Sequence, residues 1–146
     1  MFIEDLSTNG YFVHGVNVRA IGWLEVGHPF TRGPVPGDIL AALKAQVVKA
    51  HQIAYHMGFH ECSLCPEDRQ RTGIDNLLVP TRELLYVAPE LVVHYIEDHG
   101  YRPPDQFLVA VQTCPEQGSV EFLELLQRFE HIWRDRAQSG AAPDCN

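Results

Sequence analysis

The sequence predicts an α+β domain, with a small, mainly antiparallel sheet, helices packed on it, and a C-terminal half that is mostly helical. Short runs of apolar or alternating character gather in residues 10–24 and 77–87, with one helical segment between them. Three further helical segments then follow one another after residue 89. Strands and helices that segregate along the chain in this way are typical of α+β folds.

Two strands are expected near the N-terminus. Residues 11–13 form an apolar run that enters a turn at residues 14–17, and residues 18–24 form a second run whose side chains alternate between two sides. Alternation around a short turn favours a hairpin or a meander. The next stretch, residues 28–37, contains three prolines and two glycines and predicts a loop.

A long helix is expected over residues 38–57, because apolar residues recur there at spacings of three and four. Asp38 can cap its start, and Gly58 is placed to end it. Residues 59–62 then predict a short strand that enters a turn.

The second half of the chain predicts a hairpin followed by three helices. The apolar runs 77–79 and 84–87 flank a four-residue turn, and the helices are expected over residues 89–100, over residues 103–113 and after a cap at Ser119. The last helix carries the clearest apolar stripe in the chain, made by Phe122, Leu125, Leu126, Phe129, Ile132 and Trp133.

The composition predicts one globular domain over residues 1–135. The chain has 146 residues, of which 45% are hydrophobic and 21% charged, a composition typical of a soluble globular domain. A chain of this length buries enough surface for a core to hold the fold together by itself. Residues 136–146 have little to bury and are expected to form a flexible tail.

The charge balance restricts the partners that this protein can have. With 11 Lys and Arg against 19 Asp and Glu, its net charge of −8 argues against general nucleic-acid binding and fits a basic protein partner. The sequence contains no run of 18 apolar residues and therefore predicts no membrane span. The first residues also lack the basic region and long apolar core of a signal peptide, so we expect a cytoplasmic protein.

The densest group of metal-ligating side chains lies in residues 60–65. Cys62 and Cys65 have the C-x2-C spacing, in which a tight turn brings two thiolates within about 2.3 Å of one zinc ion. In a reducing compartment such a pair is more typical of a metal or redox site than of a disulfide. His60 lies two residues before Cys62 and on an extended segment would face the same side. We therefore expect His60, Cys62 and Cys65 to bind zinc.

Tetrahedral zinc needs a fourth ligand, for which the sequence offers His94, His99 and Cys114. On the helix expected after Pro89, His99 falls in the middle of the apolar face and His94 falls on its flank. When a helix docks on a sheet, its flank lies nearer than its buried face to a turn at the end of a strand. We therefore prefer His94 as the fourth ligand, with His99 as the next choice. Cys114 shares an apolar stripe and is expected to be a buried free cysteine.

Two other chemistries compete with a structural zinc. A thioredoxin-like dithiol is disfavoured because a proline follows the second cysteine, so no helix begins between the thiols. The second is a zinc-dependent hydrolase or a deaminase-like enzyme, with His60, Cys62 and Cys65 as ligands and water in the fourth position. Zinc deaminases, however, separate their H-x-E and P-C-x-x-C motifs widely, and this chain does not.

Three segments carry a resemblance to a known family: GFHECSLC (58–65), YVAPEL (86–91) and HYIEDHGYRPP (94–104). Together they resemble a family of small uncharacterised bacterial proteins, over residues from about Tyr11 to Phe129. The resemblance implies a single bacterial domain with a shared His/Cys cluster, and it implies no activity.

The function that the sequence favours is binding. We expect a small acidic protein whose structural zinc, held by His60, Cys62, Cys65 and His94, ties a turn after a strand to a helix. Such a protein would recognise a partner without catalysing a reaction, as an immunity or accessory factor does.

Overall fold

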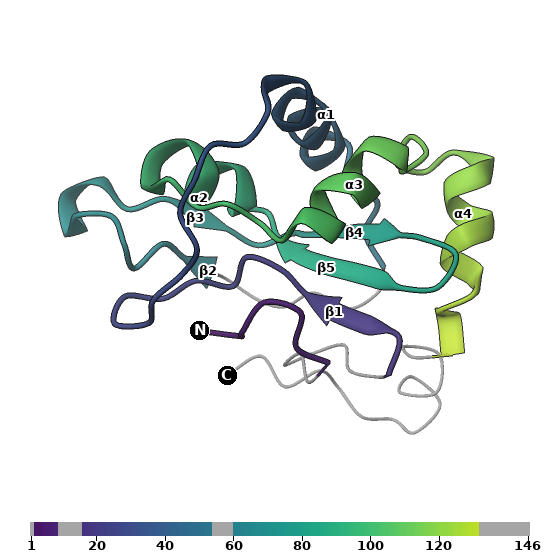
Figure 1. Cartoon of the computed structure of the whole chain (residues 1–146), viewed down its shortest axis with the longest axis horizontal. Helices are drawn as coiled ribbons and strands as arrows, with labels where there is room; N and C mark the ends of the chain where they lie inside the picture. The colour runs from purple at the N-terminus through teal and green to yellow at the C-terminus, as the bar shows by residue number, and fades with distance from the viewer. Residues whose placement is uncertain (1, 9–15, 54–59, 132–146) are drawn as a thin grey trace.

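The computed structural model describes residues 2–8, 16–53 and 60–131 of the chain. Within them the elements are, in order, β1 (Val18–Ala20), α1 (Gly37–Val48), β2 (His60–Glu61), the 3₁₀ helix η1 (Glu67–Arg69), β3 (Thr72–Gly73), β4 (Asn76–Pro80), β5 (Leu85–Pro89), α2 (Val92–His99), α3 (Asp105–Thr113) and α4 (Val120–Gln127) (Figure 1). The predicted α+β class, with a small and mainly antiparallel sheet, is confirmed.

The predicted hairpin at residues 77–87 is confirmed and forms the centre of the main sheet. β4 and β5 pair antiparallel, with Leu78 opposite Val87. Thr81 closes the turn, because its Oγ1 donates to the Leu84 carbonyl oxygen and accepts from the Leu84 N–H, both at 2.9 Å. Such side-chain bonds to the local backbone are the usual reason for threonine in a turn.

The third strand of this sheet, β1, runs parallel to β5, and Arg19 lies opposite Tyr86. The expected partner run at residues 11–13 lies outside the described residues. The strand predicted to reach Leu24 ends at Ala20, because Gly22 adopts a φ of 74° that interrupts extended backbone. Beyond it, the chain pairs briefly with the N-terminal segment through a bridge between Ile3 and Trp23.

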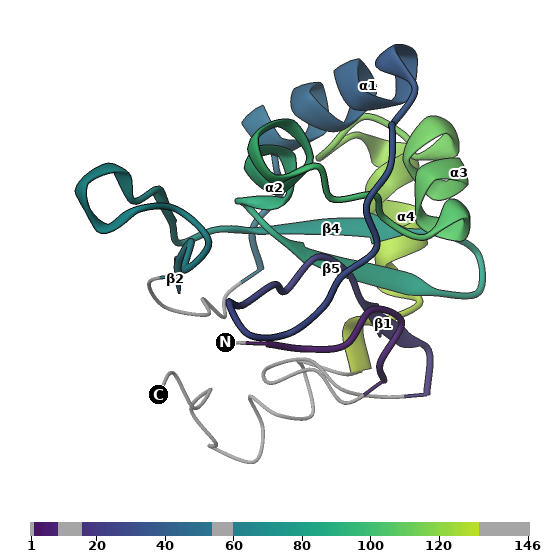
Figure 2. The same cartoon turned by 60° about the vertical axis from the view of Figure 1, so that its left-hand side comes forward.

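Both faces of the three-stranded sheet are covered, which explains why β4 and β5 read as nearly continuous apolar runs. Helices α1, α2 and α3 lie over one face, and α4 and the N-terminal segment cover the other (Figures 1 and 2). Alternate residues supply the two cores: Leu77 and Val79 pack toward α1–α3, and Leu78 packs with Trp23 and Phe122.

Two helices differ in length from the prediction. α1 ends at Val48 instead of residue 57, and the backbone N–H of His51 donates to the Gln117 side chain, 2.9 Å away, instead of continuing the helix. The remainder of the predicted helix, residues 54–57, lies outside the described residues. α2 begins at Val92 instead of Pro89, because Pro89 still belongs to β5 and pairs with Asn76.

The other two helices begin where the sequence predicts. α3 starts directly after Pro104. α4 is capped by Ser119, whose Oγ accepts a hydrogen bond of 3.2 Å from the Phe122 N–H. The expected tail at residues 136–146 lies outside the described residues. Among the helices of the described ranges, none is both long and apolar enough to cross a lipid bilayer.

Candidate metal centre

A two-stranded hairpin presents the cysteines. β2 pairs antiparallel with β3, and Cys62 follows directly, with its N–H donating to the Arg71 carbonyl oxygen at 2.9 Å. The chain then turns, so that Cys65 comes back toward Cys62. This hairpin extends beyond the edge of the main sheet, next to α2 (Figure 2). We call residues 62–65 the knuckle.

Glu90, just before α2, fastens this hairpin to the helix. Its carboxylate accepts the backbone N–H groups of Ile74 and Asp75, each at 3.0 Å. Gly73 makes this approach possible, because a Cβ there would lie 3.1 Å from Glu90 Oε2. The sequence of the β3–β4 connection therefore sets the distance between the knuckle and α2.

Helix α2 supplies two histidines to the same point. His94 is buried in its first half, and His99 is its last residue. Gly100 ends the helix in the left-handed conformation with a φ of 70°. Five residues of helix separate the two side chains by about 140° around the axis. Their imidazoles nevertheless meet edge to face, with ring centroids 4.9 Å apart, because both turn toward the knuckle.

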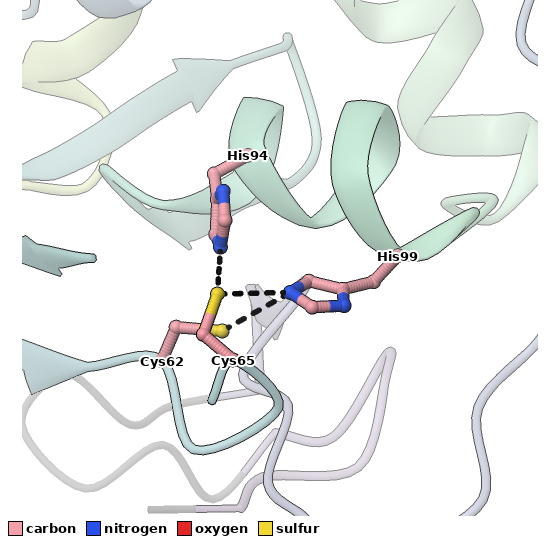
Figure 3. A group of neighbouring side chains, drawn as sticks. All are labelled: Cys62, Cys65, His94 and His99. Carbon is pink, nitrogen blue, oxygen red and sulfur yellow. Dashed lines mark hydrogen bonds between the residues drawn. The ribbon is translucent and has the colours of Figure 1, made fainter. Parts of the chain in front are cut away.

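The four side chains converge on one small volume (Figure 3). Cys65 Sγ lies 3.2 Å from His94 Nε2 and 3.4 Å from His99 Nε2, and Cys62 Sγ lies 3.4 Å from His99 Nε2. One ligand atom from each of the four residues lies within 4.8 Å of every other. Two elements far apart in the sequence thus assemble a Cys2His2 cluster that can hold a metal ion.

The donor set and its spacing fit tetrahedral zinc. Zinc bonds of about 2.3 Å to sulfur and 2.0–2.1 Å to nitrogen place a sulfur and a nitrogen ligand about 3.5–3.6 Å apart in a tetrahedron. The three sulfur–nitrogen distances, 3.2–3.4 Å, are slightly shorter than this. Two cysteines and two histidines also form one of the ligand sets typical of structural zinc sites.

Burial changes the protonation equilibria of the cluster residues. Burial raises the pKa of the Cys62 thiol, so a thiolate at this position needs a nearby positive charge. Burial, and then the neighbouring His94, lower the pKa of His99, which favours the neutral imidazole that binds metals. Burial followed by the two cysteines raises the pKa of Tyr95, so its hydroxyl stays protonated beside them.

Asp98 lies beside one of the two imidazoles. Its Oδ2 lies 2.8 Å from His94 Nδ1, one helical turn away. A carboxylate at this distance favours the proton on Nδ1 and leaves the Nε2 lone pair directed at the cysteine sulfur. Partners of this kind commonly fix the tautomer of metal-bound histidines.

Replacing Asp98 by asparagine is expected to weaken zinc binding by about tenfold, because loss of such a partner typically costs 10–100-fold in metal affinity. Competition with a chromophoric chelator measures this change. Glu97→Gln is the matched control, since Glu97 neighbours Asp98 but pairs with Lys44, at 2.8 Å. Equal affinities for the wild type and Asp98→Asn would show that Asp98 does not orient His94.

The structure brings together three of the four predicted ligands, Cys62, Cys65 and His94, and adds His99. His60 lies outside the group: its Nε2 is hydrogen-bonded to the Tyr95 hydroxyl at 2.9 Å. The alternation that would align His60 with Cys62 does not apply, because β2 ends at Glu61 and Cys62 begins the turn.

Cys114, the third candidate for the fourth ligand, lies elsewhere. It is half-buried against both hydrophobic cores, and burial raises its pKa to about 12. The sequence already made His99 a candidate, in the middle of the apolar face of the helix expected after Pro89. It did not predict that His94 and His99 would both belong to the cluster, without His60.

His60 makes stability sensitive to acid. Burial lowers its pKa from 6.5 to about 4, so the unfolded chain takes up this proton at a higher pH than the folded chain. Stability is therefore expected to fall as the pH drops from 6.5 toward 4. Urea denaturation at a series of pH values measures the effect, and His60→Gln should flatten the slope. An unchanged slope in His60→Gln would contradict the assignment.

A cavity of about 270 Å³ lies beside the cluster, and its charged lining includes Arg71, Glu90 and Glu97. Of the four cluster residues, all within the described part of the chain, only His94 lines it. Asp98, which contacts His94 Nδ1, lines it as well. The cavity thus borders the side of His94 that faces its carboxylate partner.

Comparison with known proteins identifies a family. No match was found among curated proteins or among solved structures. A family model matches residues 1–112, which include β1 to α2 and all four cluster residues. The chain belongs to the family described as domain of unknown function DUF7919.

Proposed function

We infer that this protein binds one zinc ion in a structural site and acts as a partner-binding module without catalytic activity. The observation that carries this proposal is the convergence of four protein ligands, two sulfur and two nitrogen atoms, within 4.8 Å of one another. Structural zinc sites use four protein ligands, whereas catalytic sites use three and leave the fourth position to water.

Zinc would tie together two parts of the chain that lie far apart in the sequence. The knuckle follows the short strand β2, and both histidines belong to α2, which packs in the main core. Cys65 and His99 are only partly buried. Cys62, Leu64 and Cys65 pack in the same core as α2, and a bound ion would strengthen this attachment.

The charge of the chain supports a basic protein partner. A net charge of −8 favours encounter with a positively charged surface and sets the orientation of docking. This behaviour is that of an accessory factor or of an immunity protein that masks a cationic toxin. A hydrolase or deaminase-like enzyme with His60 as third ligand is less well supported, because His60 contacts Tyr95 and Trp23.

Replacing the metal by cobalt tests whether the site is closed. The untagged protein should take up about one Co²⁺ per chain and show the intense visible bands of a tetrahedral S2N2 site. Adding acetohydroxamate, which binds open metal sites, should leave those bands unchanged. A shift of the bands with hydroxamate would reveal an open position and favour the hydrolytic enzyme over the binding module.

A further inference from the structure

A second feature, separate from the metal cluster, is a cavity of about 470 Å³ between the N-terminal segment and the loop of residues 24–31. Its lining is part polar and part apolar. The Phe2 ring stacks on the His28 imidazole, with centroids 4.1 Å apart and planes 4° from parallel. Leu24, Pro29 and Phe30 contribute further apolar surface to the lining. Such walls can pack against a flat or aliphatic group.

Two carboxylates, those of Glu4 and Asp5, line the same cavity. Asp5 Oδ1 accepts the Gly22 N–H and Oδ2 accepts the Tyr101 hydroxyl, each at 2.8 Å. These two bonds fix the orientation of the carboxylate, and each oxygen can still accept a further donor. Burial, opposed by the two bonds, raises the pKa of Asp5, so a cation placed beside it would stabilise the charged form.

We propose that this cavity binds a basic side chain, arginine or lysine, of a partner protein. The proposal rests on the proposed partner-binding function and names the chemistry by which the partner is recognised. The aliphatic stem of the side chain would lie against Phe2, Leu24 and Pro29, and its charged head would reach the carboxylates of Asp5 and Glu4.

Other ligand classes fit less well. An anion would meet two carboxylates within a chain of net charge −8. A hard divalent cation needs about six oxygen ligands, and aromatic walls do not supply them. Phe30 already contacts a guanidinium on this protein, because the Arg32 Cζ lies 4.5 Å from its ring centroid. Arg32 itself is not among the residues that line the cavity.

A hydrogen bond joins the knuckle to the loop that lines this cavity. The Val26 N–H donates to the Ser63 hydroxyl at 2.9 Å, and Ser63 lies between the two cysteines of the knuckle. At the other end of the loop, the Thr31 carbonyl oxygen accepts the Arg102 N–H at 2.9 Å. Zinc would thus order the loop through Ser63, which connects the structural metal to partner recognition.

An NMR titration of the zinc-loaded full chain tests the proposal. The probe is the peptide acetyl-Gly-Arg-Gly-amide, and its control replaces arginine by citrulline, which has nearly the same shape and no charge. At pH 8, where an ordinary histidine is neutral, the arginine peptide should shift the amide signals of residues 2–5 and 24–31 saturably. The citrulline peptide should bind at least about tenfold more weakly, since hydrogen bonds to charged groups are the stronger ones.

Variants locate the effect. Glu4→Gln and Phe2→Ala should each weaken binding of the arginine peptide several-fold. Asp5→Asn should weaken it most, and Glu4→Gln and Phe2→Ala keep the test informative if Asp5→Asn fails to fold. Glu67→Gln, an exposed acidic residue in η1, is the matched control and should bind like the wild type.

Equal shifts with the arginine and citrulline peptides, or no shifts in these residues, would overturn the proposal. Zinc analysis of the same samples separates it from the proposed function. A chain that holds zinc but ignores the arginine peptide would refute only the cavity assignment. A chain that binds the peptide through Asp5 without holding zinc would support the cavity and refute the metal site.

Discussion

Replacing Cys65 by serine is expected to abolish stoichiometric zinc binding and to lower the melting temperature by about 10 °C. Cys65 Sγ is the atom that approaches both imidazoles, at 3.2 and 3.4 Å. A ligand present at a thousand times its dissociation constant stabilises the folded state by about 4.1 kcal/mol. In a chain of about this size, each kcal/mol moves the melting temperature by about 2–4 °C. Elemental analysis and calorimetry measure the two effects.

Cys114→Ser is the matched control for this variant. Like Cys65, Cys114 is a partly buried thiol that packs against the hydrophobic core, but it is absent from the cluster. Cys114→Ser should therefore keep about one zinc ion per chain. Cys65 is preferred to Cys62 for the test, because Cys62 is fully buried and a serine there would also place a hydroxyl in the core. A Cys65→Ser protein with full zinc content would exclude Cys65 as a ligand.

The three histidines near the knuckle should separate into two classes when each is replaced by alanine. His94→Ala and His99→Ala should both lower zinc affinity by more than about a hundredfold, since each removes a direct ligand. His60→Ala should keep its zinc, because His60 Nε2 contacts the Tyr95 hydroxyl and lies outside the cluster. Chelator competition on the three purified variants measures these affinities.

The pattern across the three variants identifies the ligand set. Zinc loss in His60→Ala and retention in His99→Ala would restore the set predicted from the sequence: His60, Cys62, Cys65 and His94. Because His60→Ala also removes the edge contact with Trp23, a fall in its thermal stability at constant zinc content would not alter the assignment. Zinc retention in His94→Ala would contradict both ligand sets.

Much of the fold follows from local signals. The β4–β5 hairpin was predictable because a short turn lies between two apolar runs. The start of α4 was predictable from its serine cap and from the apolar spacing that follows it. The end of α1 was not predictable from its own sequence, because the side chain of Gln117, far along the chain, accepts the hydrogen bond of the His51 N–H. The parallel pairing of β1 with β5 also depends on distant segments, and nothing within residues 18–24 encodes it.

The candidate site was predictable in its residue types and less so in its membership. The C-x2-C spacing identified Cys62 and Cys65, and the helical position of His94 placed it near them. The choice between His94 and His99 arose because His60 was counted as the third ligand, which left one position to fill. Because the knuckle lies against α2 between these two positions, both imidazoles reach it, and His60 is hydrogen-bonded to Tyr95 instead. That approach is a tertiary contact, set in part by Glu90 and Gly73.

The metal cluster and the cavity beside the N-terminal segment lie on two sides of the same loop. Ser63 joins them through its hydrogen bond with Val26, so the two proposals meet at one side chain. Loss of zinc should therefore loosen residues 24–31 as well as the knuckle. If both proposals hold, a structural zinc would contribute to recognition without contacting the partner.

X-ray absorption at the zinc edge of the untagged protein tests the central claim most directly. A closed Cys2His2 site predicts about two sulfur atoms at 2.3 Å and two nitrogen atoms at 2.0–2.1 Å, with multiple scattering from two imidazoles. A first shell with two sulfur atoms, one imidazole and a water oxygen would contradict the closed site and support the three-ligand catalytic centre. A protein without zinc would refute the metal site itself.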